Sequence, residues 1–211
     1  MLDDESQQLA VALSDVCSPV AALRPPRRIP VSQGVAETLE IHQPGAKGGL
    51  WDASETPYLI EPMDNFASRK HEAEIFVGPA RTGKTMGLVL GPIVHAVAND
   101  PGDTLVIQMT QDKAREFSKT DIQRALTHSK GIAHLAPASQ DDNTHDKMFR
   151  HGMWLRIAWP TGPNVAGTTY RYALITDFDR IKNKDNVDGE GPLFDLARKR
   201  TTTFMSRGMT L

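Results

Sequence analysis

The segment that most constrains this chain is residues 78–85, which read Gly-Pro-Ala-Arg-Thr-Gly-Lys-Thr and form a complete G-x-x-x-x-G-K-T motif. Apolar residues precede it at 75–77 and follow it at 86–90, so the motif stands between an expected strand and an expected helix. This strand–loop–helix order is typical of a phosphate-binding loop. The alternative is a plain glycine turn, for which the spacing, the Lys-Thr pair and both flanks would have to coincide by accident.

Each residue type in this loop has a physical role in holding a nucleotide. Gly78 and Gly83 let the backbone turn tightly, so that several N–H groups point at one phosphate chain. Lys84 supplies a mobile cation for the β- and γ-phosphates, and the Thr85 hydroxyl is a suitable ligand for Mg²⁺. We therefore predict ATP and Mg²⁺ as cofactors. The predicted nucleotide-binding residues are Gly78, Pro79, Ala80, Arg81, Thr82, Gly83, Lys84 and Thr85.

The composition is that of a soluble globular protein, with 39% hydrophobic and 24% charged residues among 211. The net charge of −2 means that any contact with nucleic acid must come from a local basic patch. The single cysteine, Cys17, excludes an internal disulfide and fits a reducing compartment. No run of about 18 apolar residues is present, and the acidic start at residues 1–6 is unlike a secretory signal.

The chain before the motif predicts short elements separated by breaks. We expect a helix over 5–23, an extended Pro-rich segment over 25–30, a helix over 33–40 capped by Ser32, a loop over 43–57, and a helix from Pro57 to about 69 capped by Thr56. We assign residues 1–56 to this irregular N-terminal extension and residues 57–211 to a P-loop nucleotide-binding domain.

The rest of the chain alternates between apolar strand patterns and helical patterns. Strands are expected at 74–77, 104–108, 153–159 and 172–176, with helices from 86 to about 98 and from 112 to about 129, a turn at 99–103 and a polar stretch at 138–147. This alternation predicts an α/β P-loop NTPase fold, with a mainly parallel sheet flanked by helices and the site at the carboxyl ends of the strands.

A P-loop ATPase also needs a carboxylate at the end of a neighbouring strand to hold Mg²⁺ through water, and usually a second carboxylate to orient the attacking water. Two registers are open after the last apolar strand: either Asp177 holds magnesium and Asp179 orients water, or Thr176 takes the aspartate position and Asp177 the glutamate position. Asp177 belongs to the site in both registers. The alternative is a strand that ends in an ordinary polar turn. The predicted catalytic residues are Lys84, Asp177 and Asp179, and the predicted metal ligands are Thr85 and Asp177.

The carboxylate pattern is irregular, because Phe178 follows Asp177 where a glutamate is usual. An aspartate in place of glutamate moves the water-orienting group by about one C–C bond, and a displacement of about 1 Å can cost about 10²-fold in rate. We therefore expect slow hydrolysis.

Other candidate sites are weaker. The seven histidines show no metal-binding spacing, and Asp141, Asp142 and Asp146 are expected in a solvated loop. Trp154 and Trp159 are expected in the core rather than stacked on bases. The cluster at 198–200 with Arg207 is expected to be a solvated basic face, with a DNA-backbone contact as the alternative.

With loop and carboxylate strand placed, the chain resembles the ATPase domain of tailed-bacteriophage terminase large subunits, in the subclass called the GpA family. The similarity covers about residues 25–211, and the flanking segments rather than the loop carry it. The resembling stretches are residues 27–32, 49–52, 56–59, 114–120, 164–167, 171–172, 177–180 and 195–204.

The resemblance implies an ATPase motor that hydrolyses ATP to drive double-stranded DNA into a procapsid. It implies the terminase small subunit and the portal or procapsid as partners, a homo-oligomeric active form, no membrane partner, and a location in the host cytoplasm as a phage protein. It also implies that the chain is the family's N-terminal ATPase portion, either a piece of a longer protein or a truncated gene product, because the family's coupling motif and nuclease domain do not fit into 211 residues.

The resemblance favours the second register, with Thr176 at the aspartate position and Asp177 at the glutamate position. Members often carry an arginine before this strand that acts on a neighbour's nucleotide; the aligned residue here is Thr168, and nearby Arg171 either takes that role or is structural. Arg81 either contacts the γ-phosphate or pairs with a surface carboxylate. Two other functions stay open: a nucleotide-binding assembly module without turnover, and a helicase-like ATPase.

Overall fold

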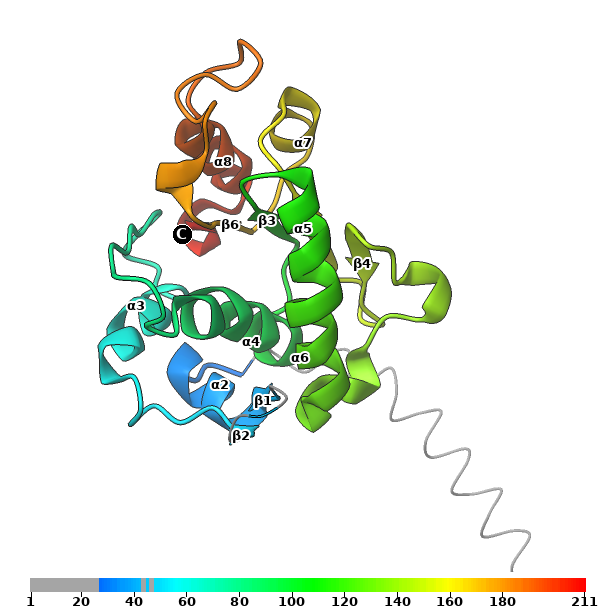
Figure 1. The fold of residues 1–211 in the computed structure, drawn as a ribbon. Helices are drawn as coiled ribbons and strands as arrows, with labels where there is room; N and C mark the ends of the chain where they lie inside the picture. The colour runs from blue at the N-terminus through cyan, green and yellow to red at the C-terminus, as the bar shows by residue number, and fades with distance from the viewer. Residues whose placement is uncertain (1–26, 43–44, 46–47) are drawn as a thin grey trace, which may run out of the picture.

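The computed structural model describes residues 27–42, 45 and 48–211 (Figure 1). The helix expected over 5–23 and the break at Pro25 and Pro26 lie outside the described residues. The described part is an α/β arrangement in which a sheet lies between α7 and α8 on one side and α2, α4 and α6 on the other (Figure 1). The expected α/β class is therefore confirmed.

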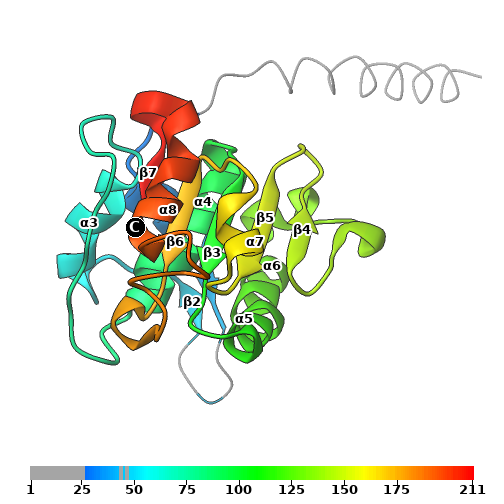
Figure 2. The same cartoon turned by 90° about the horizontal axis from the view of Figure 1, so that it is seen from above.

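A five-stranded sheet forms the centre, in the order β4-β5-β3-β6-β7 (Figure 2). All neighbours are parallel except β4 and β5. The central strand β3 is buried along its whole length, as expected for a parallel strand covered on both faces. The strands are β3 (Thr104–Ile107), β4 (Asp146–Met148), β5 (Trp154–Ala158), β6 (Tyr172–Ile175) and β7 (Met209–Thr210).

Successive residues of β3 serve two separate cores, because side chains alternate across a strand. Val106 joins the core under α2, α4, α5 and α6, whereas Leu105 and Ile107 join the core under α7 and α8. The helices are α4 (Gly91–Asn99), α5 (Gln111–Phe117), α6 (Gln123–His128), α7 (Gly162–Ala166) and α8 (Leu193–Thr201). Turns of π-helix lie at Thr85–Leu90 and Ser118–Ile122, and 3₁₀ turns at Lys130–Leu135, Ser139–Asp141, Phe178–Arg180 and Thr202–Arg207.

The strand expected at 74–77 is wrong. Only Ala73 bridges to Thr210 of β7, and Ile75 and Val77 are 75% and 90% exposed. The physical reason is that the neighbouring strand, β7, is only two residues long. It forms ladder hydrogen bonds with Glu72 and Glu74 and does not reach the rest of the segment. An apolar run without a partner strand stays irregular whatever its propensity, because pairing is what stabilises a strand.

The segment before the loop differs in detail from expectation. The first helix, α2, spans Val31–Thr38 and begins before Ser32, whose N–H donates to Asp64 Oδ1 (2.8 Å) instead of capping. The long helix expected from Pro57 is a 3₁₀ turn (Pro57–Leu59) followed by α3 (Ile60–Asn65), and Thr56 makes no capping bond. A small hairpin of β1 (Glu40–Ile41) and β2 (Gly49–Leu50) was not expected.

The helix α2 packs against α4 and contributes Val31 and Val35 to the same core as the sheet. The described part of the N-terminal extension thus shares its core with the rest, and the boundary between 56 and 57 stays a prediction. No helix in the described ranges is long and apolar enough to cross a membrane.

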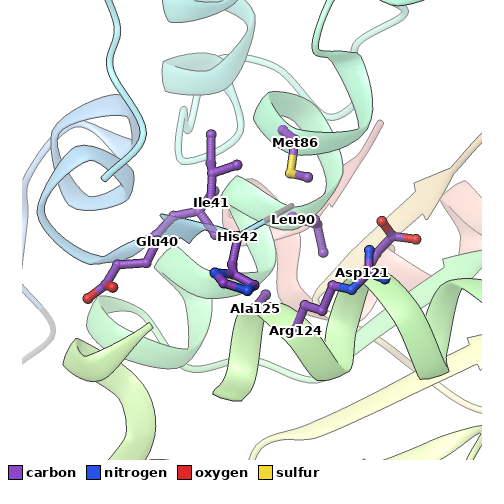
Figure 3. A pocket seen from close by; sticks show the side chains of 9 residues that line it. Glu40, Ile41, His42, Met86, Leu90, Asp121, Arg124 and Ala125 are labelled. Carbon is purple, nitrogen blue, oxygen red and sulfur yellow. The ribbon is translucent and has the colours of Figure 1, made fainter. Parts of the chain in front are cut away.

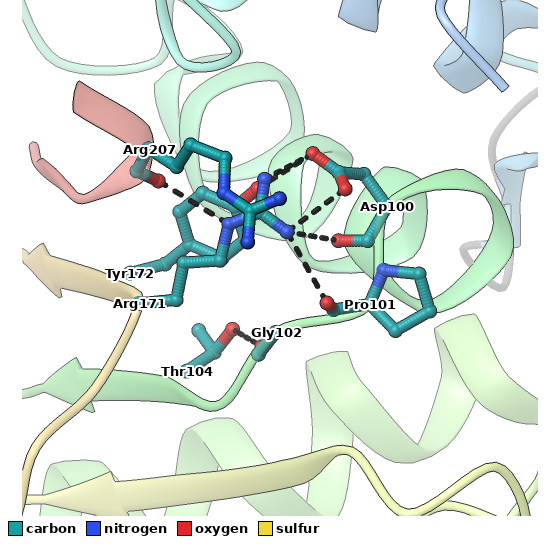
Figure 4. Close-up of polar contacts among 7 residues, drawn as sticks. All are labelled: Asp100, Pro101, Gly102, Thr104, Arg171, Tyr172 and Arg207. Carbon is teal, nitrogen blue, oxygen red and sulfur yellow. Dashed lines mark hydrogen bonds and ion pairs between the residues drawn. The ribbon is translucent and has the colours of Figure 1, made fainter. Parts of the chain in front are cut away.

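A polar network holds the start of β6 (Figure 4). Arg171 donates to both carboxylate oxygens of Asp100, to the Pro101 carbonyl (3.2 Å) and to the Arg207 carbonyl (3.2 Å). The Tyr172 hydroxyl donates to Asp100 (3.1 Å), and the Arg171 guanidinium lies 4.8 Å from the Tyr172 ring centroid. The network joins the end of α4, the start of β6 and the turn before β7.

Candidate functional site

The loop at 78–85 adopts a strained, compact conformation. Arg81 and Gly83 have φ values of 62° and 73°, in the left-handed region that a non-glycine side chain such as Arg81 rarely adopts. The Thr82 hydroxyl donates to the Pro79 carbonyl (2.9 Å), and Lys84 Nζ donates to the carbonyls of Gly78 and Pro79 (2.8 Å to the latter). The lysine ammonium is therefore inside the concavity of the loop.

The loop is braced by a segment that sequence reasoning did not connect with it. The Tyr58 hydroxyl donates to the Thr82 carbonyl (3.0 Å). A Cβ on Gly87 would lie only 2.8 Å from Leu59 Cδ1, so a glycine allows the helix after the loop to approach this segment. The sequence indicated only that residues 57–69 have a helical pattern. Such a pattern does not show which other element the segment contacts.

The helix after the loop is continuous from the π-helical turn at Thr85–Leu90 into α4. Pro92 lacks the N–H that an α-helical bond would use, and a π turn at this point is of a kind often found at functional sites. The N–H groups at such a helix start attract anions, so a phosphate at 83–85 would be stabilised by the helix dipole.

The loop and the predicted carboxylates lie at the same edge of the sheet. The chain at Ala73 runs parallel to β7, and β7 runs parallel to β6, so all three point toward one edge. The loop leaves this edge after Val77 and Asp177 leaves it after β6, with β7 between them. Because neighbouring strands are about 4.8 Å apart, Ala73 and Ala173 on the two sides of Thr210 are about 10 Å apart.

Thr176 and Asp177 point to different partners. The Thr176 hydroxyl donates to Gln108 Oε1 (2.9 Å), a buried side chain at the end of β3, while its backbone N–H donates to the Ile107 carbonyl (3.0 Å). Gln108 is a residue that sequence reasoning missed as part of this edge, although it directly follows a buried strand. The Thr176 hydroxyl therefore donates its proton to another side chain of the protein.

Asp177 is exposed and has φ 47° and ψ 42°, a left-handed conformation that aspartate tolerates better than most residues. The pKa of Lys113 is raised mainly by the hydrogen bond that Lys113 makes to Glu116 and by the charge of Glu116. The charge of Asp177 raises it to a smaller extent. Asp179 is exposed in the following turn, and its carbonyl accepts from Lys184 (3.3 Å). Asp177 and Asp179 thus both lie in the exposed turn that follows β6.

The predicted metal ligands fit Mg²⁺ by their chemistry. The Thr85 hydroxyl and the Asp177 carboxylate are both exposed hard-oxygen donors, and neither side chain has a hydrogen-bond partner in the described part of the chain. Mg²⁺ at a phosphate site takes few protein ligands, the remainder being water and phosphate. No cluster of three or more metal-ligating side chains exists among the described residues.

The two candidate arginines lie in different environments. Arg171 is buried at the start of β6, at the opposite edge of the sheet from the loop, and its guanidinium is bound by Asp100. This favours its structural alternative. Arg81 is exposed in the loop and forms no ion pair with a described carboxylate.

Some of the weaker candidates have structural contacts in the described part. Asp142 pairs with buried Lys147 rather than lying free in a solvated loop, and Trp154 packs with the core under α7 and α8. In the basic cluster Arg198 pairs with Glu72 (3.4 Å) and Arg200 donates to the Ala166 carbonyl. A small pocket between the β1 segment and α6 contains none of the predicted site residues (Figure 3).

The fold and this edge define an α/β protein in which a compact glycine-containing loop and strand-end carboxylates follow strands of a mostly parallel sheet. The family model for the phage terminase large subunit gpA, ATPase domain, matches residues 45–211, and the chain belongs to this family. The expected resemblance is confirmed, and membership indicates a phage DNA-packaging ATPase. No curated protein and no solved structure matches the chain significantly.

Proposed function

We propose that residues 78–85 bind ATP with Mg²⁺ and that the chain hydrolyses it to drive double-stranded DNA into a procapsid. The observation that carries this is the loop itself, a strained turn around the Lys84 ammonium at the start of a helix. The small subunit, the portal and further copies of the chain are its proposed partners, in the host cytoplasm.

In the proposed mechanism the backbone of the loop orients the phosphates and Lys84 binds the β- and γ-phosphate oxygens, exchanging its two carbonyl contacts for them. Thr85 and Asp177 would hold Mg²⁺, which when bound neutralises developing charge on the phosphates. In this first register Asp179 orients the attacking water; in the second register Asp177 orients it instead and Thr85 would be the remaining protein ligand of Mg²⁺. Gln108 fixes Thr176, which keeps the backbone at Asp177 in place.

A nucleotide-binding assembly module without turnover is the second candidate, and one observation favours it. The hydroxyl of Thr176, which stands at the aspartate position in the second register, is bonded to Gln108. It therefore supplies no negative charge to the metal, and its proton is already donated to Gln108.

The experiment that separates these functions is phosphate release at saturating ATP–Mg²⁺, with and without duplex DNA. We expect binding of ATP and a turnover below about 1 per second, the low end of enzyme rates, because the carboxylate pair is irregular. A faster turnover by the chain alone would show that Asp177 is fully competent. No release under any condition, with ATP still bound, would support the assembly module.

Asp177 should matter more than Asp179 in single-turnover hydrolysis. Asp177→Asn removes the charge but keeps a residue that tolerates the left-handed conformation, so we expect a loss of about 10²-fold without loss of folding. Asp179→Asn is the matched control, since it removes the same charge two residues away. A larger loss for Asp179 would move the water-orienting role there and favour the first register.

A further inference from the structure

A second feature lies at the opposite edge of the sheet, where the strands begin. A cavity of about 740 Å³ opens there between the chain entering α2, the segment after α3, and the turn before β7. Arg171 and Tyr172 of the network in Figure 4 line it together with Phe66, which stacks on Tyr172 at 4.4 Å. None of the predicted nucleotide-site residues lines this cavity.

The lining is strongly basic although the chain carries a net charge of −2. Among the described residues only two carboxylates line it, and both are engaged: Asp100 pairs with Arg171, and Asp64 accepts the N–H of Ser32. The lining cations are Arg27, Arg28, Arg69, Lys70, Arg171 and Arg207. The histidines that line it are not counted as cations, and burial lowers the pKa of one of them, His95.

Four of these cations have no carboxylate partner among the described residues. Arg28, Arg69, Lys70 and Arg207 are all exposed, and none forms an ion pair there. They come from three segments far apart in sequence, so the charge is assembled by the fold. The Arg207 carbonyl accepts from Arg171, and the network in Figure 4 therefore fixes the backbone from which Arg207 projects.

We propose that this basic cavity binds the phosphate groups of a DNA backbone, at a site separate from the phosphate loop. The inference rests on the proposed function in that the partner is DNA. The cavity has a hydrogen-bonded arginine at its base and exposed cations from three segments around it, which suits repeated phosphates along a strand better than one compact anion. Arginine and lysine at such rims neutralise backbone phosphates and release counterions, without reading sequence.

The test is the affinity of the whole chain for a short labelled duplex, measured by fluorescence anisotropy over a range of salt. The cavity variant is Arg69→Ala, Lys70→Ala and Arg207→Ala combined. The matched control removes three exposed cations from the face formed by α5, α6 and the following turn: Lys119→Ala, Arg124→Ala and Lys130→Ala. Thermal melting of both variants checks folding, and the single variants Arg69→Gln and Arg207→Gln are measured beside them.

We expect the cavity variant to bind any duplex sequence about 10- to 100-fold more weakly than the unmodified chain. Its affinity should also depend less on salt: the plot of log affinity against log salt concentration should be shallower by about 3, which is about 1 for each lost phosphate contact. The control variant should change neither. Equal losses in both variants, or no loss in the folded cavity variant and the two single variants, would overturn the proposal.

Binding of a fluorescent ATP analogue separates this proposal from the proposed function. We expect the cavity variant to bind the analogue as the unmodified chain does. If the unmodified chain does not bind the analogue, the proposed function of the phosphate loop is wrong. The DNA measurement then still tests whether the cavity binds DNA. If the cavity variant loses the analogue and keeps the duplex, the site is a nucleotide site and the DNA proposal is overturned.

Discussion

Replacing Lys84 with alanine is expected to weaken ATP binding by about 10- to 100-fold and to lower the turnover of bound ATP by a further 10²- to 10³-fold. The first figure corresponds to the loss of a hydrogen bond to a charged group, about 1.5–3 kcal/mol. The second is typical of removing one donor to the charge that develops in a transition state. Lys84 is the only lysine in the loop, and its ammonium already lies at the carbonyls of Gly78 and Pro79.

Equilibrium binding of a fluorescent ATP analogue and phosphate release at saturating ATP together measure the two losses for Lys84→Ala. The control is Lys130→Ala, which removes the same charge at an exposed position in the turn after α6. Unchanged affinity and rate in Lys84→Ala would contradict the assignment of residues 78–85 as the phosphate loop. A loss in binding without a loss in turnover would mean that Lys84 holds the ground state only.

Replacing Asp100 with alanine is expected to destabilise the folded chain by about 3 kcal/mol, because it leaves the buried guanidinium of Arg171 without its partner. Removing one member of a buried pair costs about 3–5 kcal/mol, and the low end applies since the Asp100 side chain is 21% exposed. The Tyr172 hydroxyl loses its acceptor in the same variant. Thermal unfolding should shift down by about 6–12 °C for a domain of this size.

Two controls bracket this result. Asp100→Asn keeps an oxygen acceptor for Arg171 and Tyr172 and should lose less. Glu116→Ala breaks the exposed pair with Lys113 and should change the unfolding free energy by less than about 1 kcal/mol. A loss for Asp100→Ala no larger than for Glu116→Ala would mean that the network in Figure 4 contributes little to stability.

Several elements follow from local pattern alone. The helix with Ala114, Phe117, Ile122 and Leu126 on its inner face forms where the apolar spacing predicts it, and these four residues are buried. The strand at Thr104–Ile107 likewise forms from a continuous apolar run. In both cases burial of an apolar face and local propensity favour the same structure, so no distant partner is needed to predict it.

Other features depend on partners that no local pattern identifies. The apolar run at 75–77 has the composition of a strand yet lies exposed, because its neighbour β7 is too short to pair with it. The antiparallel strand β4 arises in a polar stretch because β5 offers it a free edge. Strand formation is therefore decided by pairing, which only the tertiary structure supplies.

The sequence by itself determined the α/β class and the family and predicts the phosphate loop, because these rest on spacing within a few residues and on alternation along the chain. The tertiary structure decided which side chains meet. It committed Arg171 to Asp100 at the far edge, tied Thr176 to Gln108, braced the loop with Tyr58 and gathered unpaired cations from three segments around one cavity. Such contacts join residues separated by 24 to 71 positions. Their energies depend on burial and geometry that only the folded chain creates.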